Sequence, residues 1–191
     1  GAIISGMINY QNWDRNPEEI QFKKNGTDEI EIFTPTDIKH FVVKHEKYIS
    51  TRVSINQSPT QIDALEYGAL PKLQSKTVFL ETLVEGDKPL YHFKDAEERV
   101  NFFIVIDGVF KLLEYKKYLK DQRGRKYIAT NKRFLEQLKY YLSDCSINDK
   151  ILDGVNYKKN ELVTVFVQYY DCTNRDKSLI KEVEKSKVQL S

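Results

Sequence analysis

The chain has 191 residues, with 30 Lys and Arg against 28 Asp and Glu, and it is 40% apolar and 12% aromatic. This composition excludes a disordered chain, which has fewer aromatic and branched residues. The near-zero net charge argues against a dedicated nucleic-acid binder, so we do not expect nucleic acid as the main partner. No apolar stretch approaches 18 residues, so no membrane-spanning helix is expected.

The first 130 residues are expected to be mostly β-strand. Apolar residues alternate with polar ones, as Ile20 and Phe22 do on one face and Ile30 and Ile32 do further along. This period of two is typical of half-buried strands. The expected strands are residues 3–13, 18–23, 29–33, 41–43, 47–55, 76–85, 89–94, 99–106, 109–119 and 125–129.

Short turns punctuate these strands. Asn25-Gly26 and Asp107-Gly108 tolerate the left-handed backbone that a tight hairpin needs, and Gly124 marks a further turn. The Asp107-Gly108 turn predicts a hairpin of residues 99–106 and 109–119 at the centre of the sheet, buried on more than one face. Strands joined by tight turns indicate an antiparallel meander.

The apolar period changes near residue 130. Phe134, Leu135, Leu138, Tyr141 and Leu142 are spaced as one face of a helix, which Thr130 or Asn131 can cap. A second segment, Leu162, Val163, Phe166, Tyr169 and Tyr170, repeats this spacing. Its β-branched residues favour a strand instead, but the 3.6-residue period favours a helix. Residues 147–152 are expected to form a short helix before Gly154.

These patterns predict an α+β fold, with an antiparallel β-sheet meander followed by a small C-terminal helical region. We expect the β region to span residues 2–130 and the helical region to span residues 131–175, packed with it. Residues 176–191 are mostly charged and are expected to form a tail or a linker.

We find no motif for catalysis, metal or cofactor binding. His40 and His45 do not have the spacing of a zinc-protease helix, and His92 is expected on a sheet face. Glu81 and Glu85 would lie roughly 13 Å apart on a strand, too far for paired carboxylates of a glycosidase. We therefore expect no catalytic residue, no metal ligand and no cofactor.

One stretch, residues 111–133, holds nine basic residues against Glu114 and Asp121, a local net charge of +7. Tyr115, Tyr118 and Tyr127 are interleaved with them, so a polyanion would bind through charge and aromatic stacking. The alternative is a solvated hairpin whose lysines protect an exposed edge, so that changing Lys116, Lys117 and Lys120 to Glu alters stability by only about 1 kcal/mol. The candidate polyanion-binding residues are Lys116, Lys117, Lys120, Arg123, Arg125 and Lys126.

Several strings carry a resemblance to a known family. They are Gly6-Met-Ile-Asn-Tyr-Gln-Asn-Trp-Asp-Arg-Asn-Pro17, Phe33-Thr-Pro-Thr-Asp-Ile38, Tyr115-Lys-Lys-Tyr-Leu119, Tyr141-Leu-Ser-Asp-Cys145 and Tyr169-Tyr-Asp-Cys-Thr-Asn174. Together they resemble the soluble N-terminal region of uncharacterised outer-membrane β-barrel proteins of Bacteroidetes-type bacteria. The family pattern has a Gly-Asp-Thr-Ile turn where this chain has Ala2-Ile3-Ile4-Ser5.

The resemblance implies an exported protein on the periplasmic or cell-surface side of the outer membrane. It implies that a signal peptide precedes this region and that a membrane barrel follows it in the same polypeptide. The family supplies no catalytic residue.

The two cysteines are expected to form a disulfide. Cys145 and Cys172 each follow an Asp at the end of an apolar helical segment, so a chain reversal between the segments brings their ends together. An oxidising compartment lets the bond persist. The bridge closes a loop of about 28 residues and contributes roughly 3.5 kcal/mol. The alternative is two separate buried thiols.

Three functions remain open. The first is a non-enzymatic binding or interaction module of an exported, outer-membrane-associated protein, whose partner is an envelope protein or glycan. The second is a polyanion-binding surface at residues 111–133, for lipopolysaccharide or nucleic acid. The third is a hydrolase whose site the sequence does not locate; a pocket holding carboxylates of raised pKa would favour it.

Overall fold

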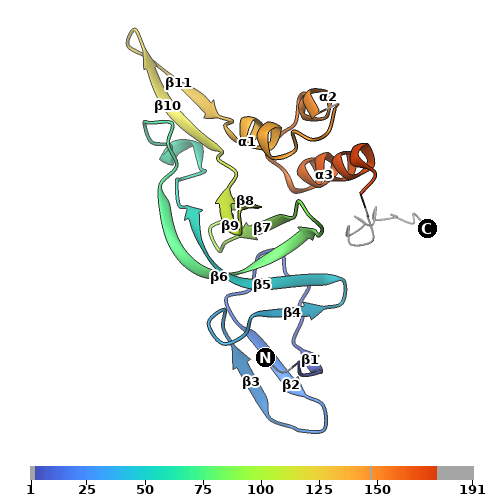
Figure 1. Cartoon of the computed structure of the whole chain (residues 1–191). Helices are drawn as coiled ribbons and strands as arrows, with labels where there is room; N and C mark the ends of the chain where they lie inside the picture. The colour runs from blue at the N-terminus through green and yellow to red at the C-terminus, as the bar shows by residue number, and fades with distance from the viewer. Residues whose placement is uncertain (1–2, 147, 176–191) are drawn as a thin grey trace, which may run out of the picture.

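The computed structural model of the chain describes residues 3–146 and 148–175, and the charged segment 176–191 lies outside the described residues. Within the described ranges the chain forms three antiparallel sheets, one short 3-10 helix (Ile62–Ala64) and three α-helices near the C-terminus (Figure 1). This arrangement confirms the predicted α+β class. None of the helices formed by the described residues is long and apolar enough to cross a membrane.

The N-terminal sheet has three strands in the order β1 (Gly6–Ile8), β2 (Ile20–Lys24) and β3 (Ile30–Phe33). Gly26 has φ of 83° in the turn between β2 and β3, a backbone that favours glycine. Ile20 and Phe22 are buried; Ile20 packs with Phe41 and Phe79 of the main sheet, and Phe22 packs on Phe33 of β3. The register places Ile30 and Ile32 beside Lys23 and Gln21, on the opposite face, where they are 64% and 55% exposed.

The main sheet has six strands in sequence order, as the predicted meander requires. They are β4 (His40–Val43), β5 (Glu46–Asn56), β6 (Leu73–Val84), β7 (Leu90–Lys94), β8 (Val100–Ile106) and β9 (Val109–Leu112). Asp107 and Gly108 have φ of 51° and 73° and join β8 to β9, which confirms the hairpin turn. The hairpin is not central, because β9 is the last strand of the sheet.

The expected strand 109–119 is wrong as a single element. It divides into β9 and β10 (Lys116–Gln122), which pairs with β11 (Arg125–Asn131) in a separate two-stranded sheet. At the break, the hydroxyl of Tyr157 accepts from Phe102 N at 3.0 Å and donates to Leu113 O at 2.7 Å. The Tyr157 side chain thus bridges Phe102 and Leu113 in place of a direct hydrogen bond between β8 and the residue after β9. The chain turns away from β8 after this point.

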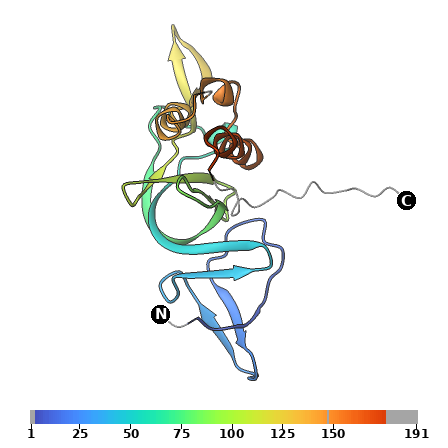
Figure 2. The same ribbon diagram turned by 45° about the vertical axis from the view of Figure 1, so that its right-hand side comes forward.

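The six-stranded sheet curves so that β5 approaches β9, and it buries both faces. Its inner face holds a cluster formed by Val53, Ile55, Val78, Leu80, Phe93 and Phe103. Its outer face along β6, β7 and β8 contributes Val84, Leu90, Phe102 and Ile104 to a larger core, which the helices cover (Figures 1 and 2). The central strands are therefore apolar on both sides, as β8 was expected to be.

The helices are α1 (Phe134–Tyr141), α2 (Asn148–Leu152) and α3 (Lys159–Thr173), so the period-based choice of helix for the last segment is confirmed. The expected caps of α1 are wrong. Thr130 and Asn131 belong to β11, and Arg133 occupies the N-cap position. Asn131 still accepts the Arg133 N–H at 2.9 Å. Pairing with β10 therefore takes precedence over capping.

The disulfide between Cys145 and Cys172 is present, with their Cα atoms 5.8 Å apart. It joins the segment after α1 to the last turn of α3. Close by, the Tyr169 hydroxyl donates to the Asp144 carboxylate at 2.9 Å. The end of α3 is thereby fixed both covalently and by polar contacts.

Asn16, in the segment between β1 and β2, connects the N-terminal sheet to the main sheet. Its backbone N–H donates to Lys94 O at 3.0 Å, and its side-chain oxygen accepts from Lys94 N at 2.9 Å. Its side-chain amide donates to Phe79 O and His92 O. Asn16 thus lies between β6 and β7 where their direct pairing ends at Glu81 and His92.

Candidate interaction surface

The strongest candidate surface is the hairpin formed by β10 and β11, called here the basic hairpin (residues 116–131). It projects from the body at one end of the molecule, and the β2–β3 hairpin projects at the other (Figures 1 and 2). Seven residue pairs hold its two strands together. Arg123 and Gly124, with φ of 56° and 76°, form its tip, where Asp121 accepts the Gly124 N–H at 3.0 Å.

The base of the basic hairpin is anchored to the loop that precedes β6. Leu119 N donates to Glu66 O at 2.9 Å, and Tyr67 forms a bridge with Leu119. Asn131 donates its side-chain amide to Ala69 O at 3.0 Å. These contacts hold the base in place, while the outer part of the hairpin is exposed.

Lys116 corrects the predicted binding set. Its side chain is buried, with the residue only 4% exposed, and it donates to Leu70 O at 2.9 Å. Burial lowers the pKa of its ammonium. Lys116 therefore anchors the hairpin instead of offering its charge to a polyanion. The expectation that changing Lys116, Lys117 and Lys120 to Glu alters stability by only about 1 kcal/mol stays a prediction, and the burial of Lys116 counts against it.

The pairing register divides the other candidate residues between two faces. Cross-strand partners share a face, so Lys120 lies with Tyr127, and Arg125 lies with Gln122. Lys117 and Lys126 lie on the opposite face, together with Ile128. The predicted set is thus not one patch.

These cations lack acidic partners within the described part of the chain. No ion pair there includes Lys117, Lys120, Arg123, Arg125 or Lys126. By contrast, Arg133 at the base pairs with Glu114 at 3.2 Å. The outer hairpin therefore carries five basic residues against Asp121, a net charge of +4.

The interleaved tyrosines have different environments. Tyr115 stacks on Tyr157, with ring centroids 4.8 Å apart and an interplanar angle of 7°, so its role is in the core. Tyr127 is 38% exposed. The sequence did not indicate Tyr67, which is exposed. Its ring centroid lies 6.0 Å from Lys126 Nζ. Exposed aromatic surface thus accompanies the charge, from Tyr127 on the hairpin and Tyr67 on the loop.

A second polar cluster lies between the sheet and α3. Glu81 on β6 accepts from His92 Nδ1 at 3.0 Å and from Lys159 Nζ at 2.7 Å. Burial alone would raise the pKa of Glu81, but the hydrogen bond from His92 and the Lys159 charge outweigh it, and the pKa is about 2. Burial lowers the pKa of His92. His92 is therefore neutral and donates to an ionised carboxylate.

This cluster contains His92 and Glu81, two residues discussed above from the sequence. His92 lies on a sheet face, as expected. Glu81 does not face Glu85, which forms an ion pair with Lys47. Among the described residues, no group of three or more His, Cys, Asp or Glu side chains is placed to hold a metal ion.

Comparison of the chain with known protein families, with curated proteins and with solved structures finds no match. The resemblance to the outer-membrane family described above therefore stays a prediction. The surface and its chemistry have to be interpreted from the residues themselves.

Proposed function

We propose that this chain is a non-enzymatic binding module of an exported, outer-membrane-associated protein, and that the basic hairpin contacts the partner. The observation that carries the proposal is the set of cations on the outer hairpin, none of which has an acidic partner in the described chain. Such residues contribute little to the stability of the fold. The Cys145–Cys172 disulfide supports export, since such bonds persist in oxidising compartments.

The polar cluster at Glu81 supports the non-enzymatic part of the proposal. A general acid at neutral pH needs a raised pKa, whereas the pKa of Glu81 is lowered to about 2. His92 from the sheet and Lys159 from α3 each hydrogen-bond to Glu81. We assign this cluster to the attachment of α3.

Site-specific photocrosslinking of the full-length protein in its native envelope tests this function. We expect a photoreactive residue at Tyr127 or Tyr67 to give one discrete adduct with an envelope component. Tyr140 is the matched control, because it is also an exposed tyrosine but belongs to α1 and not to the hairpin or the loop before β6. Identical adducts from all three positions, or none from Tyr127 and Tyr67, would overturn the proposal.

A second candidate function is polyanion binding by the same hairpin. It is favoured by the placement of cations on both faces and at the tip, which lets an extended anion contact the hairpin from either side. Lipopolysaccharide is the polyanion that fits an outer-membrane location. Binding through such contacts weakens steeply with salt.

Purified protein tests this second function directly. We expect binding to lipopolysaccharide-containing vesicles at low salt, but not to zwitterionic vesicles. The triple variant Lys117→Glu, Lys120→Glu, Lys126→Glu should abolish binding. The control Lys39→Glu, Arg52→Glu, Lys150→Glu changes the net charge equally at exposed positions elsewhere and should retain most of it. Equal losses in both variants would indicate only a net-charge effect, and no binding by the unmodified protein would exclude this function.

A further inference from the structure

Among the sheet-edge strands of the described residues, β3 and β11 lie at opposite ends of the molecule. Within the described residues β3 pairs only with β2, and β11 pairs only with β10. Figure 1 shows β3 at the lower end and β11 at the upper end. An unpaired edge presents free backbone N–H and C=O groups, which another strand can satisfy.

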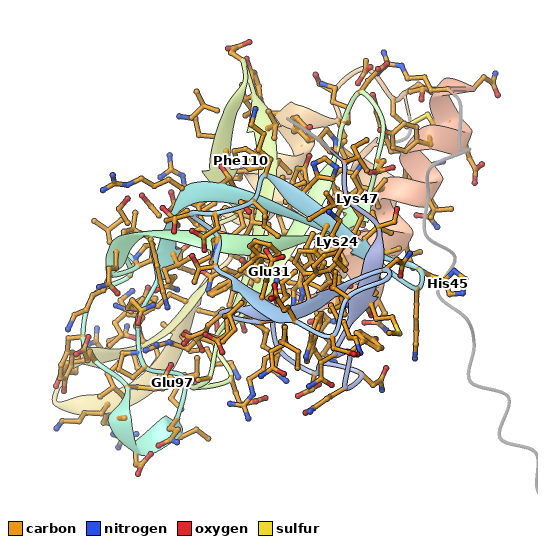
Figure 3. All side chains as sticks on the ribbon, turned by 90° about the horizontal axis from the view of Figure 1, so that it is seen from below. Lys24, Glu31, His45, Lys47, Glu97 and Phe110 are labelled. Carbon is orange, nitrogen blue, oxygen red and sulfur yellow. A yellow bond between two sulfur atoms is a disulfide. The ribbon has the colours of Figure 1, made fainter. Side chains whose placement is uncertain are left out.

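The β3 edge is apolar and acidic. Ile30 and Ile32 are exposed on one face of the strand. Glu29 and Glu31 alternate with them and form no ion pair in the described part of the chain, whereas Asp28 is held by Lys23 at 2.7 Å. The view from below labels Glu31 on this strand (Figure 3).

The β11 edge has the complementary character. Ile128 is 45% exposed, and it alternates with Tyr127. The charges on this strand are Arg125 and Lys126, both basic and both exposed. One end of the molecule therefore presents an acidic edge, and the other end presents a basic edge.

Strand alternation makes the two edges compatible in detail. Side chains on paired strands keep a period of two, so a pairing that places Ile30 and Ile32 on the same face as Ile128 fixes the other face as well. That other face then holds Glu31 and Arg125, which are diagonal neighbours when Ile30 lies opposite Ile128 in an antiparallel pair. Ile128 meets Ile30, and Lys126 lies on this same face opposite Ile32.

We propose that β11 of one copy of this chain adds to the β3 edge of a second copy. This inference goes beyond the proposed function, because it assigns a second contact to the basic hairpin, self-association through the β11 edge. Two β3 edges, or two β11 edges, bring like charges together, so the contact joins unlike ends. Such a head-to-tail contact does not close on itself, and it produces chains of copies instead of a symmetric dimer.

The contact is short, because β3 has only four residues. Most of the charges involved are also exposed, and exposed pairs contribute little. We therefore expect association that is weak, dependent on concentration and suppressed by high salt.

Sedimentation equilibrium of the disulfide-bonded protein tests the proposal. At low salt and high protein concentration we expect a series of oligomers that dissociates in high salt. The acidic-edge variant, Glu29→Lys with Glu31→Lys, and the basic-edge variant, Arg125→Glu with Lys126→Glu, should each be monomeric. An equimolar mixture of the two should associate again, because a wild-type β11 edge meets a wild-type β3 edge and the two reversed edges are also complementary.

Each outcome has a definite consequence. A monomeric wild-type protein at every concentration, or a mixture that stays monomeric, overturns the inference. Circular dichroism of both variants checks that a monomer is a folded one. The proposed function is tested separately. The acidic-edge variant keeps the basic hairpin, so it should still give the photocrosslink at Tyr127 although it no longer self-associates.

Discussion

At the scale of single residues, the Glu81 carboxylate has a structural task. Lys159 is the first residue of α3, where a positive charge opposes the helix dipole. Glu81 neutralises that charge from the sheet and also accepts from His92. One buried carboxylate therefore fixes the start of α3 on the outer face of β6 and β7.

The pH dependence of stability should report this carboxylate. The pKa of Glu81 is lowered from 4.5 to about 2 in the folded protein, so its stabilising contribution is fully present above pH 4.5 and is lost as the pH falls through about 2. The corresponding free energy is of the order of 3 kcal/mol. His92 acts in the same direction: its pKa is lowered from 6.5, so the unfolded chain takes up a proton first as the pH falls.

Glu81→Gln should lower the free energy of unfolding at pH 7 by about 2 kcal/mol, since a hydrogen bond from a charged group is lost. It should also flatten the pH dependence below 4.5. Urea unfolding at several pH values measures both effects. The control Glu85→Gln removes a partly exposed ion pair and should change stability by less than about 1 kcal/mol. The same loss for both variants would contradict the role of Glu81.

Lys116 allows a second comparison between residues of one strand. Lys116→Ala should destabilise the protein by about 1–2 kcal/mol, because Leu70 O loses its buried donor. Lys120→Ala, at an exposed position four residues on, should change stability by about 0.5 kcal/mol or less. Thermal unfolding of the two variants measures the difference, and equal melting temperatures would show that the Lys116 contact is unimportant.

At the scale of elements, the three helices form a unit that the disulfide closes. α2 is only five residues long, and short helices are marginal without tertiary support. The bridge between residues 145 and 172 restricts this unit in the unfolded chain. Its contribution should therefore be visible in the stability of the whole domain.

Replacing both cysteines by Ala should lower the free energy of unfolding by about 3 kcal/mol. In urea unfolding, this variant should have the same free energy of unfolding as the native protein with reductant. Both should be less stable than the native protein without reductant. Alkylation followed by mass spectrometry is the control. Two reactive thiols in the unreduced native protein would show that no bridge forms in solution.

Turns and helices were predictable from the sequence because their causes are local. Asp107-Gly108 adopts positive φ through its own backbone, and the apolar period of α3 is contained in the segment itself. The break after β9 was not predictable, since residues 113–115 contain neither Gly nor Pro. The groups that hold the chain at this break come from distant segments, among them the Tyr157 hydroxyl, 44 residues from Leu113, and the Gln137 side chain.

The candidate surface was predictable in composition but not in arrangement. The sequence identifies the basic residues, and the register decides that Lys117 and Lys120 lie on opposite faces. The burial of Lys116 depends on a carbonyl group 46 residues away. Likewise, nothing local to Glu81 indicates that Lys159 reaches it. Distant contacts of this kind leave no pattern in a single sequence.

At the scale of the whole molecule, Asn16 connects the N-terminal sheet to the centre of the main sheet. Asn16 makes four hydrogen bonds to backbone groups, one from its own backbone N–H and three through its side-chain amide. They lie where β6 and β7 no longer pair directly. The two sheets are consequently one cooperative structure at this point. The opposite placement of the acidic and basic edges depends on that connection.

Asn16→Ala should destabilise the protein by about 2–3 kcal/mol, because buried backbone groups of Phe79, His92 and Lys94 lose their partners. Asn9→Ala, which removes an exposed contact with Gln21, is the matched control and should have little effect. Hydrogen exchange measures where protection is lost. We expect the loss at β7, and an unchanged exchange rate at the Lys94 amide would contradict this role of Asn16.

The Tyr157 bridge also bears on the order of events during synthesis. The β8–β9 turn closes locally and forms as soon as those residues emerge from the ribosome. Residue 157 is made well after residue 119, so the Phe102 amide and the Leu113 carbonyl gain this partner only when the helical segment docks. The contacts of Lys116 and Leu119 with residues 66–70 use residues that are already made, and they form without it. A nascent chain stalled before residue 157 would hold the sheet and its anchored hairpin with this last polar bridge still open to water.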